Sequence, residues 1–185
     1  MIYWTTRKMT IAALLTAIGI AIPVFSPLRI VLEPASFTLA SHVAIFIAMM
    51  ISPGIAAAVT AGTTLGFFLT FPPVIALRAA SHIVFAIVGG IYLNRRPETL
   101  SFAIKARVFS FLLGVLHAVC EVAVVGAFYF SGGAGSGYYA QGFVHSVLLL
   151  VGVGSLVHSM FDFEIALALY KILRSQKGPA ALRDK

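Results

Sequence analysis

Charged residues are scarce in this chain of 185 residues, and two long stretches contain none at all. Only 10% of the residues are charged and 60% are hydrophobic, and the mean hydropathy is +1.01. Residues 34–77 and 122–161 contain no Asp, Glu, Lys or Arg. A water-soluble domain of this length needs far more charge to coat its surface. Each uncharged stretch is long enough for about two membrane spans at roughly 20 residues per span. The composition therefore predicts an integral membrane protein.

Motifs for catalysis and for metal binding are also missing. The single cysteine, Cys120, lies within an apolar run, so neither a disulfide framework nor a CxxC site is expected. The five histidines show no HxxxH or HExxH spacing, and we expect no metal site. No GxxxxGK[ST] loop is present, so any ATP hydrolysis must come from a partner. Without a GxSxG or aspartate-rich signature, the chain is predicted to have no catalytic residues and no cofactor.

Basic residues outnumber acidic ones by 13 to 6, and a six-span threading places most of them on one side of the membrane. The eleven residues on that side are Arg7, Lys8, Arg95, Arg96, Lys105, Arg107, Lys171, Arg174, Lys177, Arg183 and Lys185. Arg29 and Arg78 fall on the far side or inside a span. Basic residues that flank short loops stay cytoplasmic, so both termini are predicted to be cytoplasmic. In this setting a net charge of +7 indicates contacts with anionic lipid rather than with nucleic acid.

Turn-forming residues divide the apolar sequence into six predicted helices within one domain, residues 1–185. The predicted helices cover residues 9–24, 38–51, 55–70, 74–93, 108–130 and 141–170. The first apolar run lacks a small-residue cleavage site, which favours a retained helix over a secretory signal. Residues 25–37 and 131–140 are predicted as outer loops, and 171–185 as a basic cytoplasmic tail. The predicted fold class is an all-α integral membrane protein, a compact bundle of six transmembrane helices.

Small residues recur every four positions on two of the predicted helices. The first helix carries Ala13, Ala17 and Ala21, and the third carries Gly54, Ala58, Gly62 and Gly66. This spacing forms a flat stripe along which another backbone can approach closely. We expect the stripe on the third helix to pack internally. The stripe on the first helix has two interpretations, internal packing or contact with a partner protein.

Several polar side chains fall inside the predicted spans, where charge is costly and usually functional. Arg78 and His82 share one helix face, with Arg78 on the order of 6–9 Å below the outer end. Glu121 lies about 14 Å below the outer end of its helix, and His42 and His145 each lie about one turn into theirs. These five residues can therefore converge on one cavity in the outer half of the membrane. The structural alternative is an Arg78–Glu121 ion pair with histidines that only support packing.

Three segments of the chain carry a resemblance to a known family. The segment Ala13-Leu-Leu-Thr-Ala17 resembles the helix-1 motif of the S-components of energy-coupling factor (ECF) vitamin transporters. The segments from Leu28 to His42 and from Leu77 to His82 resemble the niacin branch of that family. The resemblance covers the whole chain. It implies a bacterial plasma-membrane subunit that binds a vitamin from outside, beneath the loop between helices 1 and 2. It also implies that Ala13, Ala17 and Ala21 dock on a transmembrane coupling protein, which works with two ATPases.

The resemblance also implies a ligand chemistry. A carboxylated aromatic heterocycle such as niacin suits the predicted cavity, with Arg78 binding the carboxylate. Glu121 or a histidine would bond a ring nitrogen. Aromatic side chains would stack on the ring; the candidates are Phe37, Phe71, Tyr138 and Tyr139. Pyridoxine, hydroxymethylpyrimidine and pantothenate remain alternative ligands.

Two other classes of function compete with the transport subunit. A proton-coupled secondary transporter could use Glu121, His117, His158 and Asp162 as a proton relay, but the six spans show no inverted repeat. For the His158–Asp162 pair alone, a structural hydrogen bond is the favoured interpretation. A small membrane enzyme would need a paired catalytic motif, and the sequence has none.

Overall fold

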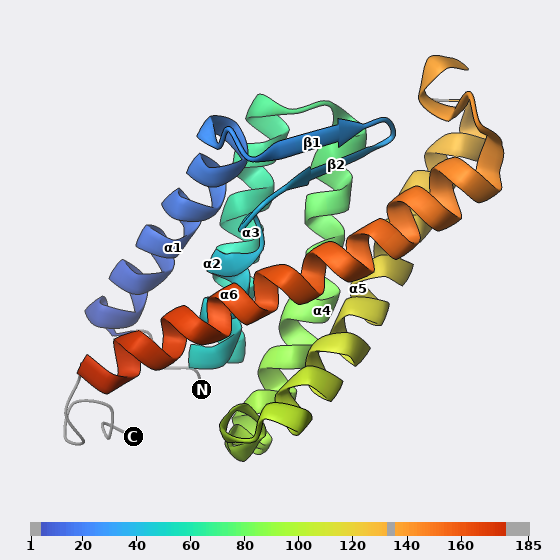
Figure 1. The fold of residues 1–185 in the computed structure, drawn as a ribbon. Coiled ribbons are helices and arrows are strands. Elements are labelled where there is room, and N and C mark those ends of the chain that lie inside the picture. Colours follow the sequence, from blue (N-terminus) through green and yellow to red (C-terminus); the bar gives the residue numbers. More distant parts are fainter. Residues whose placement is uncertain (1–4, 133–135, 177–185) are drawn as a thin grey trace.

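The computed structural model describes residues 5–132 and 136–176, which are helical apart from one β-hairpin and its connections (Figure 1). The α-helices of this part are α1 (Thr6–Phe25), α2 (Val43–Ile51), α3 (Pro53–Thr70), α4 (Pro73–Arg95), α5 (Ala103–Ser131) and α6 (Gly154–Gln176). The hairpin consists of β1 (Arg29–Leu32) and β2 (Ala35–Thr38). Shorter helical elements are η1 (Pro97–Ser101), η2 (Ser136–Tyr139) and a π-helix, η3 (Val144–Val153). The predicted helical bundle is confirmed in its main features over the described residues, and the β1–β2 hairpin is an addition to it.

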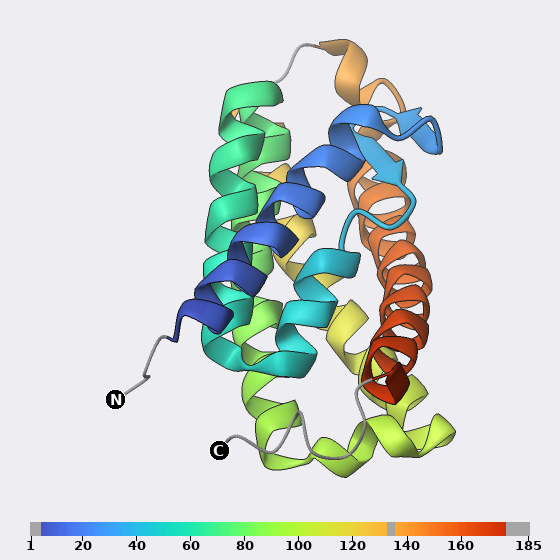
Figure 2. The same ribbon diagram turned by 90° about the vertical axis from the view of Figure 1, so that its left-hand side faces the viewer.

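The two ends of the bundle differ in which segments they carry. The first described turn of α1, the α4–α5 connection and the last turns of α6 lie at one end (Figure 2). The β1–β2 hairpin and η2 lie at the opposite end. The segments that hold most of the basic residues of the described chain therefore share one end, as the charge pattern predicted. Lys177, Arg183 and Lys185 lie outside the described residues.

Five helical stretches of the described chain are long and apolar enough to cross a membrane, one fewer than predicted. Four are α1, α3, α4 and α5, and the fifth is η3 together with α6, over Val144–Ser175. Helix α2 has 9 residues, which corresponds to about 14 Å, or roughly half of the hydrocarbon core. It reaches part of the way through the bundle, and the hairpin lies beyond its N-terminal end (Figure 1).

The helix predicted over residues 38–51 is wrong in its first third, and backbone hydrogen bonding explains why. Thr38 pairs with Arg29 in the antiparallel hairpin, so the chain is still extended at this point. Ala40 then adopts φ +69°, a left-handed conformation that interrupts a right-handed helix. The Asp162 carboxylate accepts the Ala40 N–H at 2.7 Å and the His42 N–H at 2.9 Å. These bonds replace the first turn that residues 38–42 would have made as helix.

The remaining predicted boundaries shift by a few residues. The outer segment 25–37 is mostly a hairpin, and helix α5 begins five residues before the predicted start at residue 108. The helix predicted over 141–170 is a π-helix over Val144–Val153 and an α-helix over Gly154–Gln176. The run Val144–Val153 is apolar at most positions, so its sequence shows no clear periodicity from which the helix type could be predicted.

Helices α1 and α3 pack closely through glycines. A Cβ atom on Gly62 would lie 2.6 Å from Thr16 Cγ2, and one on Gly66 would lie 2.5 Å from Ile20. Gly62 and Gly66 of the predicted α3 stripe therefore face α1. The alanine stripe of α1 points elsewhere: Ala13 and Ala17 are exposed, and Ala21 is half-buried.

A polar layer separates two apolar clusters in the interior. The buried face of α5 shows this order at intervals of four residues: Leu113, His117, Glu121 and Val125. Leu113 belongs to the larger cluster, around Phe46, Met49, Phe85 and Phe163. Val125 belongs to a smaller cluster, with Ala35, Val147 and Val151. His117 and Glu121 lie between the two clusters, and the functional site is found at this level.

Candidate ligand-binding site

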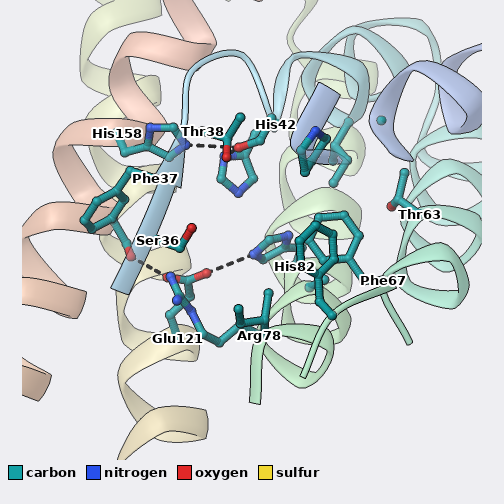
Figure 3. Close-up of a pocket in the computed structure, with 18 of the residues that line it drawn as sticks. Ser36, Phe37, Thr38, His42, Thr63, Phe67, Arg78, His82, Glu121 and His158 are labelled. Atoms are coloured by element: carbon teal, nitrogen blue, oxygen red, sulfur yellow. Dashed lines mark hydrogen bonds and ion pairs between the residues drawn. The ribbon is translucent and has the colours of Figure 1, made fainter. Parts of the chain in front are cut away.

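A cavity lies beneath the hairpin, with walls from α1, β2, α3, α4, α5 and α6 (Figure 3). Its volume, taken as the space open to the centre of a water molecule, is about 60 Å³. Because one water needs roughly 10–15 Å³ by this measure, the cavity has room for about four to six waters. A ligand with one small ring suits this space better than a large ligand does.

Arg78 forms one wall of the cavity and is 6% exposed. Its Nη2 donates to Glu121 Oε2 at 2.8 Å, and its Nη1 donates to the Pro34 carbonyl at 3.3 Å. Its Nε has no hydrogen-bond partner among the described residues. The ion pair considered as a structural alternative is thus present, yet the guanidinium lines the cavity and keeps a spare donor.

Glu121 is the hub of this part of the site. Besides Arg78, its Oε2 accepts a hydrogen bond from the Ser155 hydroxyl, and its Oε1 lies 3.1 Å from His82 Nε2. His117 Nε2 approaches the same Oε1 at 3.4 Å, one turn earlier on α5. A carboxylate 3% exposed requires hydrogen-bond donors such as Arg78 and Ser155, because an unpaired buried charge is costly.

Asp162 on α6 organises the opposite wall. Its Oδ2 lies 3.0 Å from His42 Nδ1 and 3.3 Å from His158 Nε2. The Ser41 hydroxyl lies 3.1 Å from His158 Nε2 and bridges α6 to the start of α2. His42 and His158 both line the cavity, whereas Asp162 stands behind them. The His158–Asp162 pair on α6 therefore helps to hold His42 and His158 in the cavity wall.

Aromatic side chains close the cavity on the hairpin side. Phe37 of β2 points the tip of its ring at the start of α6, where a Cβ on Gly154 would lie 2.5 Å from Phe37 Cζ. Phe71 follows α3, and the Arg29 guanidinium carbon lies 5.7 Å from its ring centre. This distance is that of a cation–π contact. Both rings line the cavity, and so does Phe67.

Three of the predicted residues lie elsewhere or are not described. His145 is exposed on η3 and does not line the cavity. Tyr139 packs 4.9 Å from the Tyr129 ring and donates to the Val125 carbonyl at 3.5 Å. The side chain of Tyr138 lies outside the described part of the chain. The predicted residues that do line the cavity are Phe37, His42, Phe71, Arg78, His82 and Glu121.

The sequence analysis did not predict the serine and threonine residues that line the cavity. These residues are Ser36, Thr38, Ser41, Thr63 and Ser155. Ser and Thr are frequent in membrane helices, where they also support helix packing, so their presence alone does not indicate a site. Thr63 illustrates this, because its hydroxyl donates to the Val59 carbonyl of its own helix at 2.9 Å. Ser155 donates to Glu121 and has no distinctive neighbour in the sequence.

A bundle with five membrane-length helices, and with buried charged side chains at an internal cavity, is the architecture of a multi-pass membrane protein. Comparison with known proteins specifies the class. The chain is 45% identical to the niacin transporter NiaX of Lactococcus lactis subsp. cremoris (strain MG1363) over 180 residues, which are 97% of this chain and 79% of the relative. The chain therefore belongs to the niacin-transporter-like S-components of ECF vitamin transporters. No family model and no solved structure matches it.

Proposed function

We propose that this protein is the substrate-binding subunit of an ATP-driven ECF importer and that its ligand is niacin, bound as the nicotinate anion. The observation that carries the proposal is a buried arginine at the wall of a cavity of single-ring size, in a chain similar to a niacin transporter. A buried guanidinium is stabilised by an anion, and its planar fork matches a carboxylate.

The carboxylate of the ligand would bind on the Arg78 side of the cavity. Glu121 holds the guanidinium through Nη2, and the incoming anion would contact the part of Arg78 that lines the cavity. The Ser36 hydroxyl, which accepts a hydrogen bond from Arg29 Nε at 3.1 Å, lines the same cavity. The positive charge of Arg29 near the mouth would also favour entry of an anion.

The ring of the ligand would lie between the aromatic side chains and the histidines. Phe37 and Phe71 offer faces for stacking, which contributes about 0.5–1.5 kcal/mol per pair beyond burial. His42 and His82 line the same cavity and offer ring nitrogens to the pyridine nitrogen. Pyridoxine has the ring but no carboxylate, and pantothenate has the carboxylate but no ring, so each satisfies only half of the site.

The exposed face of α1 suits contact with the transmembrane coupling protein. Ala13 and Ala17 are exposed, while Thr16 and Gly19 on the other side of the helix pack against α3. ATP hydrolysis would be supplied by the two partner ATPases. The basic end of the bundle would face the cytoplasm with both termini, and the hairpin would face the outside of the plasma membrane.

Ligand binding tests the carboxylate directly. We expect purified protein to bind nicotinate, and nicotinamide at least about 100-fold more weakly, because a neutral amide cannot accept a charge-assisted, bidentate contact from Arg78. Pyridoxine and pantothenate, added as competitors, should displace radiolabelled nicotinate only at high concentration. His145→Ala serves as a matched control, since this histidine is exposed outside the cavity. Equal affinity for nicotinate and nicotinamide would overturn the proposed carboxylate contact.

Assembly is tested separately from binding. Co-expressed with a coupling protein and two ATPases, the chain should purify with them, and liposomes containing the complex should accumulate nicotinate only with ATP. A secondary transporter would instead accumulate nicotinate in liposomes without any partner when a proton gradient is applied. That second result would contradict the importer and would favour the relay of Glu121, His117, His158 and Asp162.

A further inference from the structure

We propose that His42, His82 and His117 form a binding site for one divalent transition-metal ion of the zinc class. The three histidines come from the start of α2, from α4 and from α5, and each is buried. Each can contribute one ring nitrogen so that the three nitrogens lie within 4.8 Å of one another. His42 and His82 lie next to one another at the cavity wall (Figure 3).

The separation of the three rings fits a common metal ion. The ring centres of His42 and His82 are 4.8 Å apart, those of His42 and His117 are 4.8 Å apart, and those of His82 and His117 are 4.7 Å apart. With metal–nitrogen bonds of about 2.0–2.1 Å and tetrahedral angles, three imidazole ring centres lie roughly 5 Å apart. The observed triangle is nearly equilateral and close to this size.

Carboxylates stand behind the imidazoles, as they do in metal sites. Asp162 Oδ2 lies 3.0 Å from His42 Nδ1, and Glu121 Oε1 lies 3.1 Å from His82 Nε2. Metal-ligating histidines commonly donate one ring N–H to a carboxylate, which fixes the ring and frees the other nitrogen for the metal. This arrangement leaves His42 Nε2 and His82 Nδ1 as the ligand atoms.

His117 supplies an independent observation. It is 0% exposed, and neither of its ring nitrogens has a hydrogen-bond partner among the described residues. Its closest polar neighbour is Glu121 Oε1, 3.4 Å from Nε2. A buried imidazole without partners is destabilising, because both nitrogens lose their bonds to water. Coordination of a metal by one nitrogen, with the other turned to Glu121, removes this cost.

The count of buried charges also favours a divalent cation. Arg78 is the one buried cation of the described site, and the site contains two buried carboxylates, Glu121 and Asp162. With neutral imidazoles the site therefore has a charge of −1, and an anionic ligand would make the imbalance larger. One divalent ion brings the site to +1, and a monoanionic ligand then brings it to zero. Neutrality matters because uncompensated buried charge is costly.

The fourth coordination position would face the cavity, because His42 and His82 line it while His117 lies behind them. If the proposed function holds, the ring nitrogen or the carboxylate of nicotinate can take this position. The three-histidine site does not itself depend on that ligand. A second group, His42, His158 and Asp162, shares one histidine and is the main competing location.

Metal content of the purified protein tests the site. The protein should carry no histidine tag, be stripped with a chelator, and be titrated with Co²⁺ in the absence of nicotinate. We expect about one ion per chain, with a visible absorption band typical of low-symmetry four-coordinate Co²⁺. His117→Gln should weaken Co²⁺ binding by more than about tenfold and by more than His158→Gln does, and His145→Ala should leave it unchanged. Retained binding in His117→Gln, or a loss at least as large in His158→Gln, would overturn the three-histidine assignment.

A measurement on the unmodified chain covers the case in which His117→Gln does not fold. X-ray absorption of the Zn²⁺-loaded protein should show three imidazole ligands at about 2.0 Å. Fewer imidazoles, a carboxylate in the first shell, or no retained Zn²⁺ after desalting would refute the proposal. Because nicotinate is absent from both experiments, their failure leaves the proposed vitamin binding untouched, and a failure to bind nicotinate leaves the metal count valid.

Discussion

Replacing Arg78 by Met separates its contact with a ligand from its ion pair with Glu121. The variant removes the bonds to Glu121 and to the Pro34 carbonyl. Removing one partner of a buried pair costs about 3–5 kcal/mol in stability. We expect the lower end of this range, because Glu121 keeps the Ser155 hydroxyl and the contact with His82 Nε2.

The loss of affinity follows from the same physics applied to the ligand. Truncating one side of a buried charged contact costs about 2–5 kcal/mol of binding. At about 1.4 kcal/mol for each factor of ten, nicotinate should bind roughly 30- to 4,000-fold more weakly. Radioligand binding in detergent, with thermal unfolding followed by circular dichroism, measures both quantities on the same sample.

The double variant Arg78→Met/Glu121→Gln provides the control. It removes the orphaned carboxylate charge, so the melting temperature should recover most of what the single variant loses. Nicotinate binding should stay weak, since the guanidinium is still missing. If the double variant binds nicotinate within about threefold of the unmodified protein, Arg78 serves only the ion pair, and the reasoning about carboxylate recognition is wrong.

Three further predictions address the partner surface, the helix packing and the hairpin anchor. Ala17→Trp should leave nicotinate affinity unchanged but abolish ATP-dependent uptake in liposomes, because a bulky ring on the exposed face of α1 blocks the coupling protein; normal uptake would exclude this face as the docking surface. Gly62→Ala should lower the free energy of unfolding by about 1–3 kcal/mol, since its Cβ would lie 2.6 Å from Thr16 Cγ2, and an unchanged melting curve would show that α1 can move away. Asp162→Asn should weaken nicotinate binding by roughly tenfold. The amide has only one oxygen, so the hydrogen bond to either the Ala40 N–H or the His42 N–H is lost, at a cost of about 1.5–3 kcal/mol. Equal affinity would mean that the bonds from Asp162 to the end of the hairpin are not needed for ligand binding.

The helices were largely predictable because apolar runs and turn residues record where the chain enters and leaves the membrane. Pro53 and Pro73 lie in the first turns of α3 and α4, as their fixed φ and missing N–H allow. The hairpin was not predictable in the same way. Its position depends on Asp162, which is more than a hundred residues away and accepts the N–H groups at the hairpin's end.

The charged residues of the cavity wall could be predicted from the sequence. Arg78 and Glu121 are so costly in an apolar span that their positions already mark the cavity. His145 shows the limit of this reasoning, because depth along a helix says nothing about which face a residue occupies. The three-histidine cluster shows a second limit. A motif search examines spacing within one segment, whereas His42, His82 and His117 are brought together from three different helices.

The π-helix η3 determines which side of α6 meets the interior. Ser155, His158 and Asp162 follow it directly and point toward Glu121, the cavity and the base of the hairpin, respectively. An α-helix turns about 100° per residue. Removing one residue from Val144–Val153 would thus rotate this whole face away from its partners, although the deleted residue touches none of them. The number of residues in the π-helix, more than the identity of its side chains, therefore sets which face of α6 is turned toward the site.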